Sequence, residues 1–268
     1  MAYYLEEKKG LKLFFFESFR KLGVDAFFTT RSGGFSQEPF ATLNLALHVN
    51  DDPNTVVKNR QKLISLWGLE FKNFVTAEQV HGTEIAIVDR GDGGRGIFDL
   101  KTALKKTDGL ITGEKNLGLL TFYADCVPLY FFSPDPFLIG VAHAGWRGSL
   151  AKIGEKMVNS FVALGAKTQN LFCGIGPAIG PCCYQVGAEV ANKFIEQGYK
   201  NGVILKNQEH YLNLWEINAE ILIRAGVPPE NIEKISVCTS CHPELFFSYR
   251  RDGGITGRMA AGIIKREV

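Results

Sequence analysis

The sequence predicts a mixed α/β (α+β) domain, and three observations support this class. Short apolar runs typical of strands alternate along the chain with segments whose apolar residues have helical spacing. The 268 residues are 46% hydrophobic and 22% charged, which is enough to bury a substantial core. No internal repeat, low-complexity tract or linker divides the chain. We therefore expect residues 1–268 to form a single compact domain.

In the first half, the apolar runs predict strands at residues 12–17, 24–30, 74–77 and 84–88. Asp52 and Pro53 predict the start of a helix, because Asp caps free N–H groups and Pro fits the first helical position. We expect that helix to end near Leu66, before Gly68. Residues 89–107 carry several glycines and charges, which is typical of a surface loop.

In the second half, strands are predicted at residues 117–123, 127–132, 137–141, 171–175, 235–238 and 258–264. A helix is predicted after Gly148 and ends at Gly165. One face of it carries core residues at spacings of three and four, namely Leu150, Ile153, Met157, Phe161 and Leu164. Two further helices are predicted at residues 188–196 and 211–225.

Charge and hydropathy exclude several classes of function. The net charge is only +2, which gives no electrostatic footprint for nucleic acid or for an anionic membrane. No apolar run approaches the length of a membrane span. The first ten residues contain no apolar signal-peptide core, so we expect a cytoplasmic protein.

Three motifs place reactive side chains beside glycine or proline at predicted strand ends. They contain His81, Cys126 and His143, and the third motif follows the buried run at residues 137–141. Two imidazoles and one thiolate form a typical catalytic zinc set with an open position for water or substrate. Their separations along the chain match no local metal-binding spacing. From the residues alone, hydrogen-bonded histidines with a buried free thiol are the favoured alternative.

Other polar residues are candidates for anion binding. Arg31 precedes Ser32, Gly33 and a second glycine, and consecutive backbone N–H groups of this kind bind anions. A tight turn with a solvated Arg explains the same residues. Arg147 is a candidate anion contact or a residue that packs where a helix begins. Asp125 points away from Cys126 on a strand and is expected to orient another group from behind.

The six cysteines are expected to be reduced. Cys182 and Cys183 are adjacent, and neighbouring cysteines rarely bridge without strain. Cys238 and Cys241 form a C-x-x-C-H sequence, as in covalent haem attachment or half of a zinc site. A second C-x-x-C is absent, so the favoured interpretation is a set of small buried residues near a strand end.

Taken together, these motifs resemble the YfiH-like laccase-domain family of the purine nucleoside phosphorylase type, formerly labelled multicopper polyphenol oxidoreductases. The resemblance covers about residues 24–262. It is carried by TRSGG (30–34), LNL (43–45), NR (59–60), QVHG (79–82), ADCVP (124–128), AHAGWRG (142–148), GP through CCY (176–184) and SYRRD (248–252).

The resemblance implies a mixed-sheet α/β/β sandwich similar in shape to a toxin deamidase. It implies a catalytic domain with Zn²⁺ held by His81, Cys126 and His143. It also implies phosphorolysis of adenosine, inosine, guanosine and methylthioadenosine, with an adenosine deaminase side activity. Our hypothesis for the substrate contacts follows from polarity and membership of these motifs: Arg31 and the Gly33 region bind phosphate, and Asn44 holds the ribose or base.

Two alternative enzymes and a non-enzymatic role remain open from the sequence. Cys126 and His143 are also a nucleophile and base for a cysteine hydrolase. A copper-dependent phenol oxidase, as in the older family label, needs more histidines than the five in this chain, so copper is less expected than zinc. A nucleoside-sensing protein without activity is the third alternative. No strong interface stripe is visible, so a monomer or weak homodimer is expected.

Overall fold

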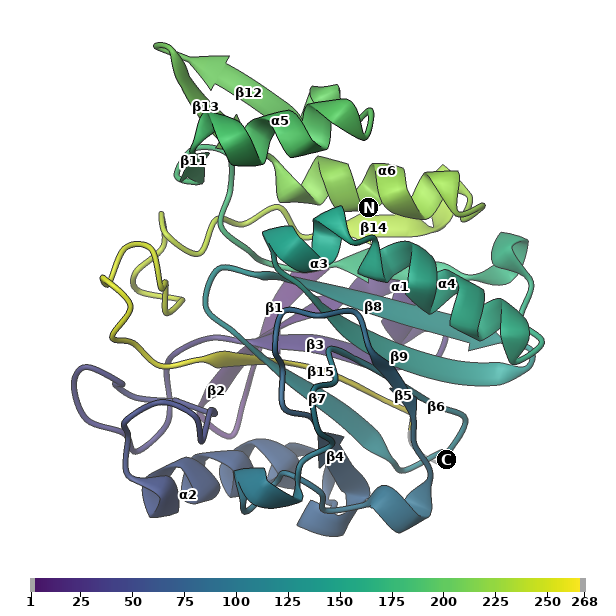
Figure 1. Ribbon diagram of the computed structural model, residues 1–268. Helices are drawn as coiled ribbons and strands as arrows, with labels where there is room; N and C mark the ends of the chain where they lie inside the picture. Colours follow the sequence, from purple (N-terminus) through teal and green to yellow (C-terminus); the bar gives the residue numbers. More distant parts are fainter. Residues whose placement is uncertain (1–2, 266–268) are drawn as a thin grey trace.

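The computed structural model describes residues 3–265, in which two six-stranded mixed sheets face each other and helices cover their outer sides (Figure 1). The first sheet has the strand order β1 (Tyr3–Lys8), β2 (Leu11–Phe16), β3 (Asp25–Thr29), β15 (Met259–Ile264), β7 (Gly118–Tyr123) and β4 (Phe74–Thr76). Within it only the β4–β7 pair is parallel among the described strands.

The second sheet contains the strands that lead to the candidate site. Its order is β14 (Ile232–Lys234), β10 (Phe172–Ile175), β8 (Val127–Pro134), β9 (Phe137–Ala144), β6 (Gly109–Thr112) and β5 (Ile85–Ile87). The central β8–β9 hairpin pairs over eight positions, from Val127 opposite Ala144 to Pro134 opposite Phe137. This long pairing fixes the position of residues at the open end of the hairpin.

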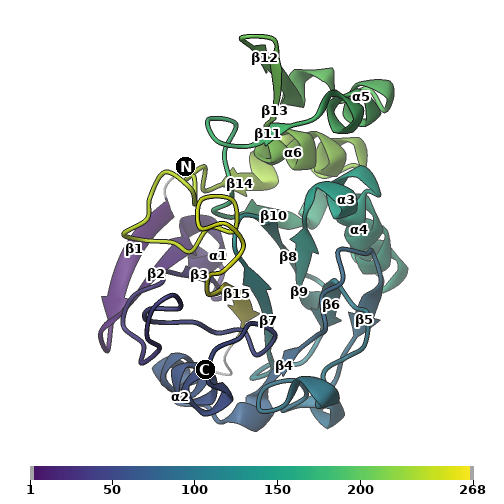
Figure 2. The ribbon, with the colours of Figure 1, turned by 60° about the vertical axis from the view of Figure 1, so that its left-hand side comes forward.

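Helices cover both outer faces, and a small sheet stands off the main body (Figures 1 and 2). The second sheet is covered by α3 (Trp146–Leu150), α4 (Ile153–Ala163) and α6 (Leu214–Arg224), and the first by α2 (Pro53–Ile64). The short α1 (Glu17–Lys21) follows β2. The small sheet has the order β11 (Gln185–Val186), β13 (Glu209–Leu212) and β12 (Val203–Lys206), with α5 (Ala188–Glu196) beside it.

The central strands are apolar on both sides because each sheet is buried on both faces. Side chains alternate between faces. In β2, Phe14 and Phe16 pack into the cluster between the sheets, whereas Leu13 and Phe15 pack outward against the cluster that includes α2. In β8, Tyr130 faces the other sheet, and its neighbours pack beneath the covering helices.

Sequence features account for the start and end of α2 as expected. The Asp52 carboxylate accepts hydrogen bonds from the backbone N–H groups of Asn54 and Thr55, and Pro53 is the first helical residue. A short 3₁₀ turn extends the helix to Trp67, and Gly68 ends it in the left-handed conformation at φ 66°. The two mixed sheets and their covering helices confirm the mixed α/β class. The helix α2 lies outside the expected α/β/β layers.

Several element boundaries differ from the predictions. The helix predicted from residue 211 begins at Leu214, because Tyr211 belongs to β13 and Asn213 caps the helix through its side chain. The strand predicted at residues 235–238 lies earlier, at Ile232–Lys234, and Cys238 makes only an isolated bridge with Ala178. Among residues 3–265, no helix has both the length and the apolar character needed to cross a membrane.

Candidate metal centre

The structure brings His81, Cys126 and His143 together. One ligand atom from each of the three side chains lies within 4.8 Å of the others. The rings of His81 and His143 meet edge to face, with centroids 4.8 Å apart. Three side chains separated by many residues in the sequence therefore converge as one possible ligand set.

The strand ends of the second sheet position these residues. Cys126 directly precedes β8, and His143 lies in β9 opposite Pro128, so the hairpin places the two side by side. His81 lies in the connection between β4 and β5 and has a positive φ of 61°. Gly145 leaves room for the cluster, since a Cβ there would lie 3.0 Å from both the Cys126 sulfur and the Cδ2 atom of His81.

The fully buried Asp108, which the sequence interpretation missed, orients two of the three side chains. Its Oδ1 lies 2.8 Å from Nδ1 of His143 and accepts the backbone N–H of His81 at 3.1 Å. Its Oδ2 accepts the N–H groups of Val80 and Gly82. With Nδ1 of His143 bonded to Asp108, Nε2 is the nitrogen left to bind a metal, as is usual for metal-ligating histidines.

The charges of the cluster favour a thiolate. Burial disfavours ionisation of Cys126, but the adjacent His143 and His81 outweigh it and lower the pKa of the thiol to about 6. Burial likewise opposes protonation of His143, but Cys126 and Asp108 raise the pKa of its imidazole to about 9. Without a metal, the neutral-pH state is therefore a thiolate–imidazolium pair, and a thiolate is the form that binds metals.

The three side chains line a cavity of about 520 Å³. Its remaining lining combines aromatic rings, guanidinium groups and a few other polar groups: His48, Gln79, Phe122, Ala124, Asp125, Trp146, Arg147, Tyr184, Tyr249, Arg250 and Arg258. The size is within the range of small-molecule sites. A planar, polar ligand with an anionic partner fits this combination of walls.

Positive charge predominates around the cavity. The guanidinium of Arg147 stacks on Trp146, with its Cζ 4.4 Å from the ring centroid, and donates no hydrogen bond to another described residue. The buried Arg60 stacks on Phe122 at 4.4 Å. Its hydrogen bonds go to the backbone carbonyls of residues 45, 96 and 97, with no described carboxylate within ion-pair distance.

The predicted anion-binding turn lies away from the cavity lining. Nε and Nη1 of Arg31 donate to the carbonyls of Ala41 and Pro243, and its guanidinium stacks on Phe247. The backbone N–H of Gly33 donates to the Thr42 hydroxyl, and that of Ser32 to Thr30. These donors are thus occupied within the protein. Of the predicted substrate contacts, only Arg147 lines the cavity.

Asn44 and Asp125 support the cavity wall through hydrogen bonds. The fully buried Asn44 accepts the backbone N–H of Arg258, which places that arginine at the cavity. Asp125 accepts the Thr239 hydroxyl at 2.6 Å and the backbone N–H of Arg250 at 2.7 Å. Asp125 therefore orients other groups of the wall, but it lies in a bend rather than on a strand and lines the cavity itself. The acid on the histidine is Asp108.

The donor set does not fit a multicopper centre. All five histidines of the chain are described, and only His81 and His143 converge with Cys126. His48 lines the same cavity, while His210 and His242 do not. A mononuclear site with two imidazoles and one thiolate is what these side chains can build. Such a set suits zinc and also copper.

Comparisons with known proteins identify similar sequences. Residues 25–266 match the family model described as multi-copper polyphenol oxidoreductase laccase. The purine nucleoside phosphorylase YlmD of Bacillus subtilis is 40% identical over 249 residues, covering 91% of this chain and 89% of that protein. The protein of the same name from Geobacillus stearothermophilus is 41% identical over 254 residues, covering 91% of each.

Solved structures show the same fold. The crystal structure of YlmD from Geobacillus stearothermophilus superposes with a TM-score of 0.93 at 40% identity and covers 98% of both chains. The Bacillus licheniformis hypothetical protein YfiH gives a TM-score of 0.91, also at 40% identity, with 97% of this chain and 98% of that chain covered. The family model, the relatives and the fold show that the chain belongs to the laccase-domain (YfiH) family, whose model is described as multi-copper polyphenol oxidoreductase laccase.

Proposed function

We propose that this protein is a zinc-dependent purine nucleoside phosphorylase. It would convert a purine nucleoside and inorganic phosphate into the free base and ribose 1-phosphate. The observation that carries the proposal is the convergence of His81, Cys126 and His143 on a cavity lined by aromatic and guanidinium groups. The names of the relatives support the choice of reaction. The six unpaired cysteines suit a reducing, cytoplasmic setting.

Zinc is the proposed metal because the set provides three protein ligands, as catalytic zinc sites do, and leaves one side facing the cavity. A blue-copper site would add a weak axial ligand, usually methionine, and no methionine lines this cavity among the described residues. Zinc bound there would supply Lewis acidity towards phosphate or water. Asp108 would hold the His143 ring in the metal-binding tautomer throughout the reaction.

Phosphate would be held by the arginines of the cavity. Arg147 is the most available of them, since its guanidinium is exposed and stacks on Trp146 without a hydrogen-bond partner among the described residues. Arg250 and Arg258 lie on the wall formed by the C-terminal segment. Nη1 of Arg250 donates to the carbonyl of Gln185, and Nη1 of Arg258 donates to the carbonyls of Thr256 and Gly257. Guanidinium groups bind phosphate through paired, charge-assisted hydrogen bonds.

The purine would lie between the aromatic walls, which include Tyr184 and Tyr249. The phosphate oxygen would attack C1′ while the bond from C1′ to the purine nitrogen breaks, and the bond's electron pair leaves with the base. We expect adenosine, inosine, guanosine and methylthioadenosine as substrates, because stacking recognises the ring system rather than its substituents. In a side reaction on adenosine, water would replace the 6-amino group and release ammonia.

The test is to incubate the purified protein with adenosine and inorganic phosphate and to identify the products by chromatography. Adenine together with ribose 1-phosphate is the expected result. Inosine alone would show that only deamination occurs, and the proposed phosphorylase activity would then be wrong. No conversion of any of the four nucleosides by zinc-loaded protein would overturn the proposal as a whole.

A cysteine hydrolase is the second candidate, since the pKa of Cys126 is lowered and that of His143 raised, as in a nucleophile–base pair. In this case chelation of the metal would increase activity, because a metal-bound sulfur is a weaker nucleophile. Under the phosphorylase proposal, chelation abolishes activity and readded zinc restores it. Assays with and without chelator therefore separate the two.

A further inference from the structure

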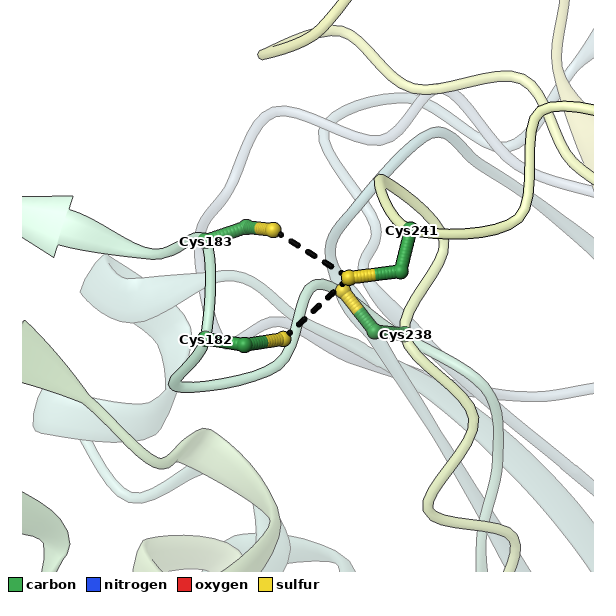
Figure 3. A group of neighbouring side chains, drawn as sticks. All are labelled: Cys182, Cys183, Cys238 and Cys241. Atoms are coloured by element: carbon green, nitrogen blue, oxygen red, sulfur yellow. Dashed lines mark hydrogen bonds between the residues drawn. The ribbon is translucent and has the colours of Figure 1, made fainter.

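Four cysteines outside the cavity lining form a second cluster, here called the four-cysteine cluster (Figure 3). Cys182 and Cys183 lie in the turn that precedes β11, and Cys238 and Cys241 lie in the loop that follows β14. Cys238 is buried as expected, whereas Cys241 is exposed, so the interpretation of this pair as small buried residues is wrong for Cys241. The side chains of the two loops point toward one another.

The spacing of the sulfurs fits one shared metal ion. The sulfur of Cys241 lies 3.4 Å from that of Cys182 and 3.4 Å from that of Cys183, and all four sulfurs lie within 4.8 Å of one another. A tetrahedral ion with bonds of about 2.3 Å places its sulfur ligands roughly 3.8 Å apart. This value lies between the two sulfur–sulfur distances of 3.4 Å and the 4.8 Å within which all four sulfurs lie.

A disulfide explains the arrangement less well. It requires two sulfurs about 2.05 Å apart and has one partner for each. Here Cys241 is equally close to two sulfurs, and any single disulfide would leave two thiols packed against it. All six cysteines are unpaired. Four thiolates around one centre are instead typical of structural zinc sites.

The backbone around the cluster favours a thiolate at Cys238 and allows the loops to approach closely. The N–H of Gly180 donates to the sulfur of Cys238 at 3.2 Å, and the N–H of Cys241 is a second donor to it. Amide donors stabilise an anionic sulfur. A Cβ at residue 180 would lie 2.9 Å from the Trp215 ring and 3.3 Å from the sulfur of Cys182, so glycine lets this loop approach.

We propose that Cys182, Cys183, Cys238 and Cys241 bind one Zn²⁺ ion as a structural site, separate from the metal centre in the cavity. The ion joins the two loops that form one wall of the cavity. Tyr184 follows one pair of ligands, and Tyr249 and Arg250 follow the other. Arg250 already bridges the loops by donating to the carbonyl of Gln185 at 2.8 Å.

Metal content tests the proposal without any measurement of turnover. Protein purified in reductant and zinc, then freed of loosely bound metal, should contain two zinc ions per chain. The double variant His81→Ala with His143→Ala should keep one, and Cys182→Ser with Cys241→Ser should lose the other. A single zinc in the unmodified protein, absent from the histidine variant, would overturn the proposal.

Cobalt spectroscopy covers the case in which the cysteine variant fails to fold. In the histidine double variant, bound Co²⁺ should show the strong sulfur-to-metal absorption of four thiolates and the visible bands of a tetrahedral site. Absence of this spectrum, or a disulfide from Cys241 to Cys182 or Cys183 in peptide maps of the freshly purified protein, would contradict a four-thiolate site. Failure of the phosphorylase proposal could change the zinc count of the unmodified protein, but it would leave the zinc content and the cobalt spectrum of the histidine double variant unchanged.

Discussion

The His81–Cys126–His143 centre and the four-cysteine cluster are both built from residues that are far apart in the sequence, yet their surroundings differ. The first brings together three side chains that can bind a metal, with a buried carboxylate behind one imidazole and a cavity in front. The second has four sulfurs and lines no part of that cavity. Three ligands leave a coordination position for chemistry, whereas four close the ion and leave only a structural role. The comparison teaches that ligand number and access, rather than ligand type, separate the two roles.

The largest effect is expected from a variant that disrupts the His81–Cys126–His143 centre and leaves the four-cysteine cluster intact. His143→Ala should lower phosphorolysis by about a thousandfold or more, because a Lewis acid supplies several kcal/mol and each 1.36 kcal/mol is tenfold in rate. Steady-state kinetics with inosine and phosphate measure the effect. His210→Ala, in the small sheet, is the matched control and should remain active. If folded His143→Ala protein keeps full activity, the centre has no catalytic role.

The next prediction uses pH to distinguish the sulfurs. In metal-free protein, the alkylation rate of Cys126 should be level above about pH 6 and fall tenfold per pH unit below it, because its pKa is lowered to about 6 and only the thiolate reacts. Burial raises the pKa of Cys173, and the pKa of Cys241 is raised to about 11, so both should react slowly at neutral pH. Peptide mapping by mass spectrometry assigns each site.

Two further results bear on this pH dependence. His143→Ala should move the midpoint for Cys126 upward, because it removes the main cation beside the thiolate. Zinc should protect Cys126 at neutral pH, where the thiolate binds the metal. A midpoint near that of an ordinary thiol in the unmodified protein would contradict the thiolate–imidazolium pair.

A third prediction concerns the carboxylate behind the metal centre. Asp108→Asn should lower zinc affinity of the centre by about 10- to 100-fold, the usual effect of losing such a partner. If the amide NH₂ group takes the place of Oδ1, it faces the backbone N–H of His81, and Nδ1 of His143 loses its acceptor. Competition with a metal-sensitive dye measures the affinity. Asp135→Asn, at an exposed turn, is the control, and equal affinities of the two variants would rule out this role for Asp108.

A fourth prediction tests which arginine serves the open side of the metal centre. Arg147→Ala should raise the KM for phosphate by about tenfold, as expected for one charge-assisted hydrogen bond. Arg31→Ala should leave that KM unchanged and instead lower the free energy of unfolding by about 1–3 kcal/mol, since it loses bonds to Ala41 and Pro243. Phosphate titrations and urea unfolding measure both. The reverse pattern would return phosphate binding to the Arg31 turn.

The smallest effect on catalysis is expected from the four-cysteine cluster. Cys182→Ser with Cys241→Ser should lower the Tm and raise the KM for the nucleoside, because the wall with Tyr184 and Tyr249 becomes less ordered. The kcat should change little, since the metal centre stays intact. A loss of activity as large as that of His143→Ala, in folded protein, would place the cluster in the chemistry and remove the contrast between the two regions.

The sequence predicted most of the fold because the central strands are continuous apolar runs and α2 has a strong capping signal. It missed β1, whose residues are partly charged and alternate between exposed and half-buried. That strand is defined by its pairing with β2, which local pattern does not reveal. The small sheet around β13 was missed for the same reason.

The candidate site was predictable where polar residues interrupt strand ends, as at His81, Cys126 and His143. Asp108 was not predictable, because it belongs to none of the sequence motifs and meets its partners His81 and His143 only in the folded chain. The one local signal is an acid directly before the apolar run of β6. The four-cysteine cluster combines an adjacent pair with a C-x-x-C pair, and only the tertiary structure shows that these two pairs meet.

Arg60 has a consequence for every anion that approaches the cavity. Its three acceptors are neutral carbonyl groups, so they satisfy its N–H groups without cancelling its charge. Apolar surroundings screen that charge weakly. Its electric field therefore adds a long-range attraction for an anion in the cavity, on the other side of the Phe122 ring. The hydrophobic layer beneath the first sheet therefore keeps the electrostatic potential of Arg60 from being screened by water.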